Sequence, residues 1–393
     1  MNMKLYERNS YLKEYVTTVT KCFSDGDKIY VCLKDTIFFP EEGGQNADTG
    51  SLSYEGKTLK ILHGEVTGSK DSGIRYLVDA PVAEGTEVTC LLDWKDRFDR
   101  MQNHGGEHIL SGIIHNIYGY DNIGFHLSDD DYVTLTVNGK LNDEQIEELE
   151  RKANQAVYDN LPITDSYPSI EEIRNISYRS KIEIEGQIRL ITIGDKDSPL
   201  DVCACCAPHV KSTGEIGIIK VFSHASSKGG TQLSILCGRR ALELMTIRLD
   251  ELDLIARSFS THTDNVPDMI EKLKSDNALL KVRLGEIAED TIIKSIETSG
   301  KRCVFTDIEL SPVSMKNIYN HLTSNYDGYV GLFVGDDTSG YRYNAGSRDR
   351  DSKELVLLMK DALNAKGGGS SEMISGRLDA AKNEIEAFWN GIG

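Results

Sequence analysis

The sequence has no apolar run that approaches the roughly 20 residues a membrane-spanning helix needs. Its first residues, MNMKLYERNSYLKEY, also lack the apolar stretch of a secretory signal peptide. We therefore expect a cytoplasmic protein with no membrane partner. Basic side chains are in the minority, because 44 Lys and Arg stand against 62 Asp and Glu, a formal net charge of −18. This balance argues mildly against a nucleic-acid partner, although a local basic patch can work within an acidic protein.

Cysteine is scarce, with eight residues in a chain of 393, so the chain does not carry the disulfide framework of a small secreted domain. Three of the eight gather as Cys203, Cys205 and Cys206, and His209 follows closely. In a reducing compartment, thiols beside a histidine indicate metal binding. The other five are scattered in apolar surroundings, where a buried inert thiol is expected.

Two pairs of residues with the same spacing predict a metal site. His104 and His108 lie four residues apart in a stretch (97–118) that is predicted to be helical, so both imidazoles share one helix face. Cys205 and His209 have the same separation in DVCACCAPHV. Zinc takes thiolate and imidazole ligands in tetrahedral geometry, and catalytic sites keep one position open for water or substrate. We therefore predict that these four residues bind one Zn2+.

Other interpretations of this cluster stay open. The zinc could be structural and fully coordinated, with Cys203 or Cys206 in place of Cys205. A lone H-x3-H pair on a helix is also common without a metal. Glu107 lies inside the first pair but follows the glycines, so the segment is not the H-E-x-x-H motif of metalloproteases. Glu107 is a candidate proton carrier or a partner of a metal ligand.

Hydrophobic periodicity predicts an α+β protein in four parts. Residues 1–95 contain short alternating runs such as KIYVCL (28–33) and predict a β-rich domain. In residues 96–240 we expect helices on one side of an antiparallel sheet. This part includes a hairpin at 123–137 that turns at residues 129–131 and an amphipathic helix at 141–161. It also includes a strand at 188–193 that leads directly to the Cys cluster. Residues 241–299 are helical, and residues 300–393 form a second α/β unit.

The helical part carries a short heptad seam with one polar interruption, at Ile270, Leu273, Asn277, Leu280, Leu284 and Ile287. It is too short for a long coiled coil and predicts a helical hairpin arm. This arm or the last domain is a candidate contact for a homodimer.

Two glycine-rich stretches are predicted to be loops. FFPEEGGQNADTG (38–50) is either a long turn or a loop whose backbone approaches a ligand closely. KGGGSS (366–371) precedes a helix predicted at 377–388. It is either a simple linker or a loop whose free backbone amides bind phosphate. It is not a P-loop, because no G-x4-G-K-[ST] is present.

The same motifs resemble the editing region of alanyl-tRNA synthetase. FFPEEGGQNADTG is similar to the F-Y-P-E-G-G-G-Q-x-x-D-T-G stretch of that family, and RMQNHGGEHILS is similar to R-x-x-N-H-[TS]-x-x-H-[IL]-L. The stretch from IRLITIGD to GEIGIIKV looks like the segment that contains C-x-G-T-H, and GGGSSEMISGRLDAAKNEIEAF resembles the end of the DHHA1 domain. With no aminoacylation domain ahead of residue 1, the architecture resembles long-form AlaX, a free-standing trans-editing protein.

The resemblance implies a fold and an activity. Residues 1–95 would be a β-barrel of the translation-protein type, 96–240 a zinc-binding editing domain, 241–299 a helical linker and 300–393 a DHHA1-like α/β domain. The activity would be hydrolysis of mischarged tRNA(Ala), chiefly Ser-tRNA(Ala), with Gly-tRNA(Ala) as a second candidate. The C-terminal domain would hold the tRNA or pair two subunits.

The resemblance also implies roles for individual residues. The zinc ligands carry over to His104, His108, Cys205 and His209, and His104, His108 and Glu107 are the candidate catalytic residues. Gly43, Gly44 and Gln45 would line the pocket for the 3′-terminal aminoacyl-adenosine, and Gly105 would adjoin the amino acid.

Several positions depart from the family pattern. Gly105 stands where the family has Thr or Ser, whose hydroxyl is expected to help recognise serine. Ala207 and Pro208 replace Gly-Thr before the last histidine, Glu42 replaces a glycine, and Gln232 replaces an arginine. The ligands persist while the pocket changes, which fits either an altered substrate preference or a repurposed paralogue.

Two function hypotheses follow. The first is a zinc-dependent aminoacyl-tRNA hydrolase, which cleaves a carboxylic ester. The alternative is a non-catalytic, zinc-stabilised tRNA-binding or regulatory paralogue. A ligase is disfavoured because no ATP-binding catalytic domain is recognisable.

Overall fold

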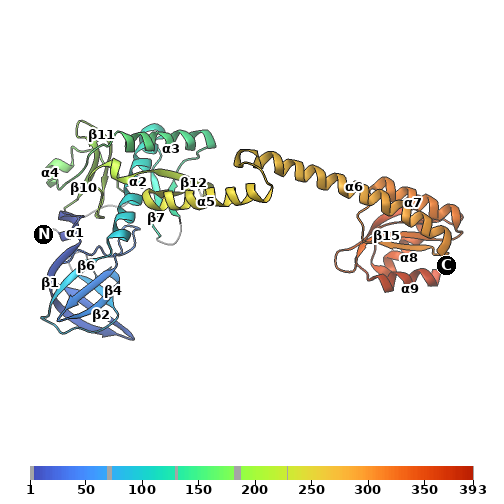
Figure 1. The fold of residues 1–393 in the computed structure, drawn as a ribbon, viewed down its shortest axis with the longest axis horizontal. Coiled ribbons are helices and arrows are strands. Elements are labelled where there is room, and N and C mark those ends of the chain that lie inside the picture. Colours follow the sequence, from blue (N-terminus) through green and yellow to red (C-terminus); the bar gives the residue numbers. More distant parts are fainter. Residues whose placement is uncertain (1–3, 69–72, 129–131, 181–186, 228, 393) are drawn as a thin grey trace. The chain divides into compact units, whose positions relative to one another are not determined.

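The computed structural model describes residues 4–68, 73–128, 132–180, 187–227 and 229–392. The chain divides into two compact units, Met1–Glu251 and Leu252–Gly393, and each is described by itself. Both units mix helices with sheets (Figure 1), which confirms the α+β class. Within the described residues, no helix combines the length and hydropathy that a membrane crossing requires. The four-part division at residues 95, 240 and 299 stays a prediction.

The first unit begins with a short helix, α1 (Leu5–Arg8), and a closed barrel of six antiparallel strands (Figure 1, blue). Leu52, Leu59, Ile61 and Tyr76 are among the buried side chains that fill it. The barrel confirms the predicted β-rich N-terminus, although periodicity did not single out its first and third strands. In the order β1-β2-β5-β4-β3-β6, the strands are β1 (Glu14–Asp25), β2 (Lys28–Leu33), β5 (Ile74–Val78), β4 (Lys57–Val66), β3 (Gly50–Tyr54) and β6 (Glu87–Leu92).

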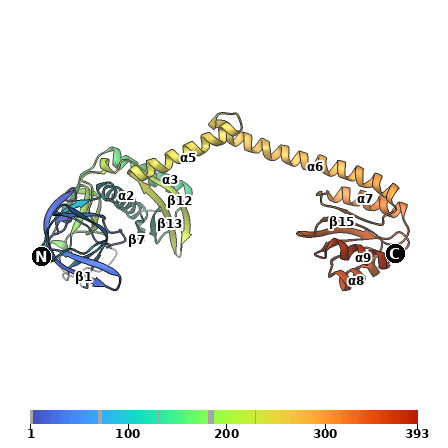
Figure 2. The ribbon, with the colours of Figure 1, turned by 60° about the horizontal axis from the view of Figure 1, so that its bottom comes forward.

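The rest of this unit surrounds one long helix, α2 (Trp94–Tyr118), visible in Figure 2. The prediction of a single antiparallel sheet is wrong, because two are present. One has the order β12-β13-β8-β7 and the other β11-β10-β9. The helices α3 (Asp143–Tyr158) and α4 (Ile170–Ile173) and the 3-10 turn η1 (Thr213–Ile216) complete the unit, and Asn142 caps α3. The strands are β7 (Asn122–His126), β8 (Val133–Val137), β9 (Ile163–Ser166), β10 (Leu190–Asp195), β11 (Ser198–Ala204), β12 (Ile219–Ser227) and β13 (Gly230–Cys237).

The strand that leads to the cysteines differs from the predicted one. Cys203 lies on β11, and Cys205 and Cys206 follow that strand directly. The strand predicted at 188–193 corresponds to β10, which precedes β11 in the chain. The two strands form a tight hairpin that turns between Asp195 and Ser198, so the chain reverses once more before it reaches the cysteines. The predicted turn at residues 129–131 lies outside the described residues.

Helix α2 is buried on almost every side. From Arg97 to Ile114, every residue except Phe98 is buried, including the polar ones. Glycines make this close packing feasible, because a Cβ on Gly106 would lie 2.2 Å from Cys237 Sγ and one on Gly112 would lie 2.7 Å from Asp201 Cβ. The helix was predicted from one apolar face, but its polar faces are buried too and must find partners inside the protein.

The second unit contains a long helix and a five-stranded sheet. Helix α5 (Gly238–Ser258) spans the boundary between the units, and the turn η2 (Thr263–Asn265) leads into α6 (Val266–Ser299). The heptad residues Leu273, Leu280, Leu284 and Ile287 are each at least half exposed on α6. Pairing of two copies through this seam stays a prediction.

Helices cover both faces of the C-terminal sheet (Figure 2). Val330, Leu332 and Val334 of β15 pack against α6 and α7, whereas Phe333 packs with residues of α8 and α9 on the opposite face. The sheet order is β14-β15-β16-β18-β17, and the pairing of β14 with β15 is parallel. The elements are β14 (Cys303–Thr306), α7 (Pro312–Asn325), β15 (Val330–Asp336), β16 (Gly340–Gly346), α8 (Ser352–Leu363), β17 (Lys366–Gly369), β18 (Met373–Leu378) and α9 (Lys382–Ile392).

The loop predicted at KGGGSS is wrong for its first four residues, whereas phosphate binding there stays a prediction. Lys366–Gly369 forms β17 and pairs with β18, and the last helix begins only at Lys382. A Cβ on Gly367 would lie 2.3 Å from the carbonyl oxygen of Ser375, so close pairing of the two strands explains this glycine.

Candidate metal centre

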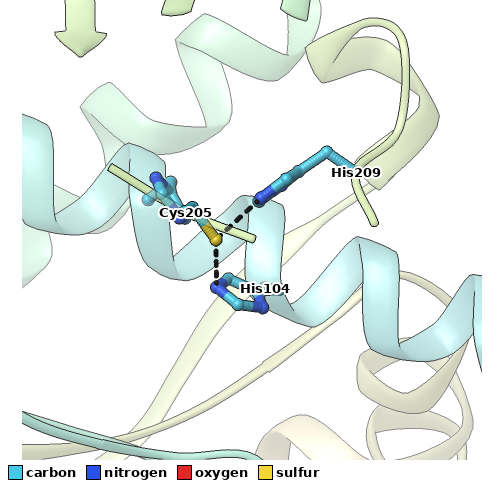
Figure 3. A group of neighbouring side chains, drawn as sticks. His104, Cys205 and His209 are labelled. Carbon is cyan, nitrogen blue, oxygen red and sulfur yellow. Dashed lines mark hydrogen bonds between the residues drawn. The ribbon is translucent and has the colours of Figure 1, made fainter. Parts of the chain in front are cut away.

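The four predicted zinc ligands meet in one buried place. His104 and His108 lie one turn apart on α2, and Cys205 and His209 come from the segment that follows β11. One ligand atom from each lies within 4.8 Å of the others. Cys205 Sγ is 3.6 Å from His104 Nε2 and 3.3 Å from His209 Nε2 (Figure 3). Three imidazoles and one thiol around a small space form a donor set that suits tetrahedral zinc.

His104 is oriented by the barrel half of the unit. Its Nδ1 lies 2.7 Å from Oε1 of Gln45, which belongs to the glycine-rich loop at residues 38–50. An amide oxygen accepts, so Nδ1 carries the proton and the lone pair of Nε2 points toward Cys205. Gln45 is fully buried, and its Nε2 has no hydrogen-bond partner in the described part of the protein. The loop therefore orients the candidate ligand His104 and places beside it the Gln45 amide nitrogen, a donor with no partner in the described residues.

His108 is oriented by a carboxylate. Its Nδ1 lies 3.3 Å from Oδ2 of Asp201, and Arg179 donates to both Asp201 oxygens at 2.7 Å. Burial would raise the pKa of Asp201, but the hydrogen bonds from His108 and Arg179 outweigh burial and hold that pKa below its usual value. A carboxylate that holds the far nitrogen of a histidine is a common support for a metal ligand.

Two of the four candidate ligands, Cys205 and His209, are held in the protonation states that bind a cation. Burial would raise the pKa of the Cys205 thiol, but His104 and His209 beside it hold the pKa well below its usual value. Burial lowers the pKa of His209 to about 3. A thiolate and a neutral imidazole are the forms that bind a metal.

Cys203 is the nearest competitor as a thiol ligand. Together with His108 and Asp201 it forms a second group whose ligand atoms lie within 4.8 Å of one another. However, both oxygens of Asp201 already accept from Arg179. Cys206 belongs to neither group in the described chain. The set with Cys205 therefore fits a metal better.

Glu107 lies next to the ligands in sequence but bonds elsewhere. It is buried, and its Oε1 accepts hydrogen bonds from Ser111 Oγ at 2.6 Å and from Asn122 Nδ2. It is not part of either candidate metal group in the described residues. Its role as a proton carrier stays a prediction.

The loop at residues 38–50 packs closely against β7. Gly44 has φ +84°, and a Cβ there would lie 2.5 Å from the carbonyl oxygen of Phe125. The Phe125 ring lies 4.9 Å from the ring of His104, so the loop, β7 and α2 meet at the candidate centre. Gly43 has φ +65°, and no atom lies within 4 Å of a Cβ built there. Close contact with β7 thus explains Gly44, whereas Gly43 borders open space.

Gly105 contacts aliphatic side chains. A Cβ at this position would lie 3.1 Å from Cδ1 of Ile216 and 3.7 Å from Cγ2 of Val210, and both of these residues are buried. A side chain added at position 105 would therefore start out toward this aliphatic pair.

Sequence reasoning missed the ion pair that joins the loop to α2. Asp48 and Arg97 are both fully buried; the guanidinium binds the carboxylate and also donates to the carbonyl oxygens of Ile37 and Ser10. Asp201 was also missed, although a signal was present. Asp201, Cys203 and Cys205 are spaced by two, so on an extended strand they share one face.

Comparisons with known proteins find similarity to a domain of tRNA synthetases and to proteins named alanyl-tRNA editing proteins. Residues 188–233 match the family model described as the threonyl and alanyl tRNA synthetase second additional domain. The alanyl-tRNA editing protein AlaX-L of Pyrococcus horikoshii is 28% identical over 397 residues, which span 97% of this chain and 96% of the relative. The alanyl-tRNA editing protein Aarsd1 of Mus musculus is 24% identical over 408 residues, or 98% and 96% of the two chains.

A putative alanyl-tRNA editing protein of Saccharomyces cerevisiae is 27% identical over 424 residues, which cover 93% of this chain and 90% of that protein. The similarity thus extends through both units and is not confined to the metal-ligand motifs. It confirms the family resemblance seen in the sequence: over almost its whole length, this chain is similar to the AlaX-type alanyl-tRNA editing proteins.

Proposed function

We propose that this protein hydrolyses the ester bond of mischarged aminoacyl-tRNA(Ala), and that His104, His108, Cys205 and His209 hold a zinc ion at the reaction site. The convergence of three imidazoles and a thiol within 4.8 Å carries the proposal. The names of the relatives supply the reaction class, because they are described as alanyl-tRNA editing proteins.

A bound zinc ion would supply a Lewis acid for the ester carbonyl or for the attacking water. The chain itself prepares the ligands for that ion. Gln45 holds the Nδ1 proton of His104, and Asp201 holds Nδ1 of His108, so each ring offers Nε2 to the centre. Burial of the site excludes bulk water and strengthens these electrostatic contacts.

The substrate would enter beside the glycine-rich loop. Gly43 borders open space, and the buried Nε2 of Gln45 has no partner in the described residues, so it can donate to an ester or ribose oxygen. We therefore assign Gly43, Gly44 and Gln45 to the binding of the terminal aminoacyl-adenosine. Glu107, one residue from His108, is the carboxylate that we assign to proton transfer.

Selectivity for the amino acid is the finer part of the proposal. We infer serine as the chief substrate and glycine as the second. Gly105 offers no hydroxyl for serine, and its Cα faces Ile216 and Val210. Recognition of the serine hydroxyl would then depend on other polar groups, and the buried Nε2 of Gln45, which has no partner in the described residues, is one candidate.

The decisive experiment is deacylation in vitro. Purified zinc-loaded protein is incubated separately with Ser-, Gly- and Ala-tRNA(Ala), and release of the amino acid is followed. We expect hydrolysis of Ser-tRNA(Ala) well above the rate for Ala-tRNA(Ala). If none of the three esters is cleaved faster than in buffer, the enzyme assignment is wrong and a non-catalytic paralogue is left.

The ligand set has its own test. Metal analysis of Cys205→Ala is compared with Cys203→Ala, which removes a buried thiol only two residues away. Cys205→Ala should lose zinc, whereas Cys203→Ala should keep it. The opposite pattern would assign the thiolate ligand to Cys203.

A further inference from the structure

An aromatic patch with two lysines lies at the junction of the barrel and α2. The ring of Trp94 lies 5.5 Å from both Tyr11 and Phe98, measured between centroids. Lys13 Nζ lies 4.5 Å from the centroid of Trp94, and Lys211 Nζ lies 4.7 Å from that of Tyr11. The three rings are partly exposed and both lysines are exposed. We call these five residues the Tyr11–Trp94 patch.

This patch is tied to the candidate metal centre. Lys211 follows the predicted ligand His209 by two residues, and Ser10 Oγ donates to the carbonyl oxygen of His209 at 2.8 Å. The backbone amide of Lys211 donates to Tyr11 Oη at 3.2 Å. The segment from His209 to Lys211 therefore contains both a predicted metal ligand and a residue of the patch.

The charges of the patch are available to an anion. In the part of the chain that the structure describes, no carboxylate lies within ion-pair distance of Lys13 or Lys211. Glu215 is the acidic neighbour, and it accepts hydrogen bonds from the Tyr11 hydroxyl and the Lys211 amide.

A second cation–aromatic pair shows the contrast. Arg75 lies over the ring of Tyr30, but its guanidinium is paired with Glu65 at 2.8 Å and with Asp25 at 3.3 Å. The Tyr11–Trp94 patch differs from that pair because it combines three neighbouring rings with two lysines that have no ion-pair partner in the described residues. In a chain with a net charge of −18, such a place is where a polyanion would be attracted.

We propose that the Tyr11–Trp94 patch binds the unpaired nucleotides that precede the aminoacylated end of the tRNA. Single-stranded nucleic acid is bound by aromatic rings that stack on bases and by cations that contact phosphates. A lysine ammonium sits on a flexible four-carbon stem, so it can turn from the ring to a phosphate and leave the ring face to a base. The inference rests on the proposed function, because it assigns a binding site for the same substrate.

The first test measures salt dependence. Binding of deacylated tRNA(Ala) to the full chain is followed by fluorescence anisotropy, alongside the same tRNA without its unpaired 3′ nucleotides. Each phosphate contact with a single strand contributes about 0.7 to the slope of log K against log salt concentration. Lys13→Ala with Lys211→Ala should therefore lower that slope by about 1.4 for intact tRNA and leave it unchanged for truncated tRNA.

A matched control is available on the barrel. Lys57 Nζ lies 6.0 Å from the ring centroid of Tyr54, so Lys57→Ala removes the same charge from another lysine–tyrosine pair. It should leave the slope at the wild-type value. An equal loss in Lys57→Ala, or an unchanged slope in the double variant, would overturn the proposal.

The second test uses the two tryptophans, Trp94 and Trp389. Stacking of a base on Trp94 should quench its fluorescence when intact tRNA binds. Trp94→Leu should weaken binding about ten-fold, because it removes the ring on which a base would stack. Trp94→Phe should abolish the quench and keep affinity within about two-fold. A quench that persists in Trp94→Phe would locate the contact elsewhere.

The two proposals fail in different ways. If the wild-type chain deacylates no mischarged tRNA, the proposed function is wrong. If the wild type and the double lysine variant deacylate Ser-tRNA(Ala) with the same KM and the same salt dependence, the function stands and only the Tyr11–Trp94 patch is refuted.

Discussion

The contact between Gly106 and Cys237 offers the sharpest test of the packing around α2. Replacing Gly106 by alanine would place the new Cβ 2.2 Å from Cys237 Sγ. Cys237 cannot move easily, since it is fully buried and its amide donates to Asn103 Oδ1 at 2.8 Å. Overpacking costs about 1–3 kcal/mol, and alanine recovers about 1 kcal/mol of helix propensity. With the overpacking at its upper end, we expect Gly106→Ala to lower the free energy of unfolding by about 2 kcal/mol.

The clash can be relieved by a second change. Cys237→Ala removes the sulfur and leaves its Cβ 3.3 Å from the new one. Alone, it should cost about 1 kcal/mol for the lost methyl-sized group. The double variant should then lie near the wild type, which gives a coupling energy of about 3 kcal/mol.

Urea unfolding of the first unit is followed through the fluorescence of Trp94 in a Trp389→Phe background. It gives the free energy of unfolding of the wild type, the two single variants and the double variant. Trp389 belongs to the core of the second unit, so its replacement leaves the packing around α2 untouched. Costs that simply add, with no coupling between positions 106 and 237, would refute the close packing described here.

Three further predictions concern charge and metal. Asp48→Asn leaves the buried guanidinium of Arg97 without its carboxylate, so the free energy of unfolding should fall by about 3–5 kcal/mol in the same urea assay. Removal of zinc by a chelator should lower the melting temperature of the first unit but not that of the second in calorimetry, because all four predicted ligands lie in the first. Burial would lower the pKa of His108, but Cys203 and Asp201 beside it raise the pKa well above its usual value. A proton must then leave His108 when the metal binds, so zinc affinity should rise with pH across the neutral range, by about ten-fold per pH unit for each proton displaced. A competition titration with a coloured chelator measures this affinity. An affinity that does not change with pH would contradict the prediction.

The four candidate metal ligands could be named from the sequence because their signals are local. His104 and His108 repeat at the helical spacing, and Cys205 and His209 repeat that separation. That the two pairs meet in space is a long-range fact, and spacing alone supports it only weakly. The family resemblance supplied the missing link, and the structure brings the four groups together.

The partners of the ligands could not be predicted in the same way. Gln45 reaches His104 across the boundary between the barrel and the rest of the first unit, and no local pattern encodes that contact. The burial of Asp48 and Arg97 likewise depends on how the loop docks on α2. A charged residue in a sequence is usually read as solvent-exposed, so a fully buried pair is missed until both elements are in place.

The strand at Lys366–Gly369 shows where composition misleads. Glycine-rich stretches are ordinarily read as loops, because glycine loses much conformational entropy in regular structure. Here the absence of side chains permits close pairing with β18 at the sheet edge. The decisive factor was the neighbouring strand, whose position periodicity does not reveal.

The order of the ligands along the chain has a consequence for how the protein is made. Ribosomes add about 5–20 residues per second, so His104 and His108 are synthesised roughly 5–20 seconds before Cys205 and His209. During that interval the nascent chain presents two imidazoles on one helix with no thiolate. Such a nitrogen-only pair follows the general affinity order and prefers copper or nickel to zinc. At the proposed site, Cys205 would add the thiolate donor, so only its later synthesis would complete a donor set of the kind found in zinc sites.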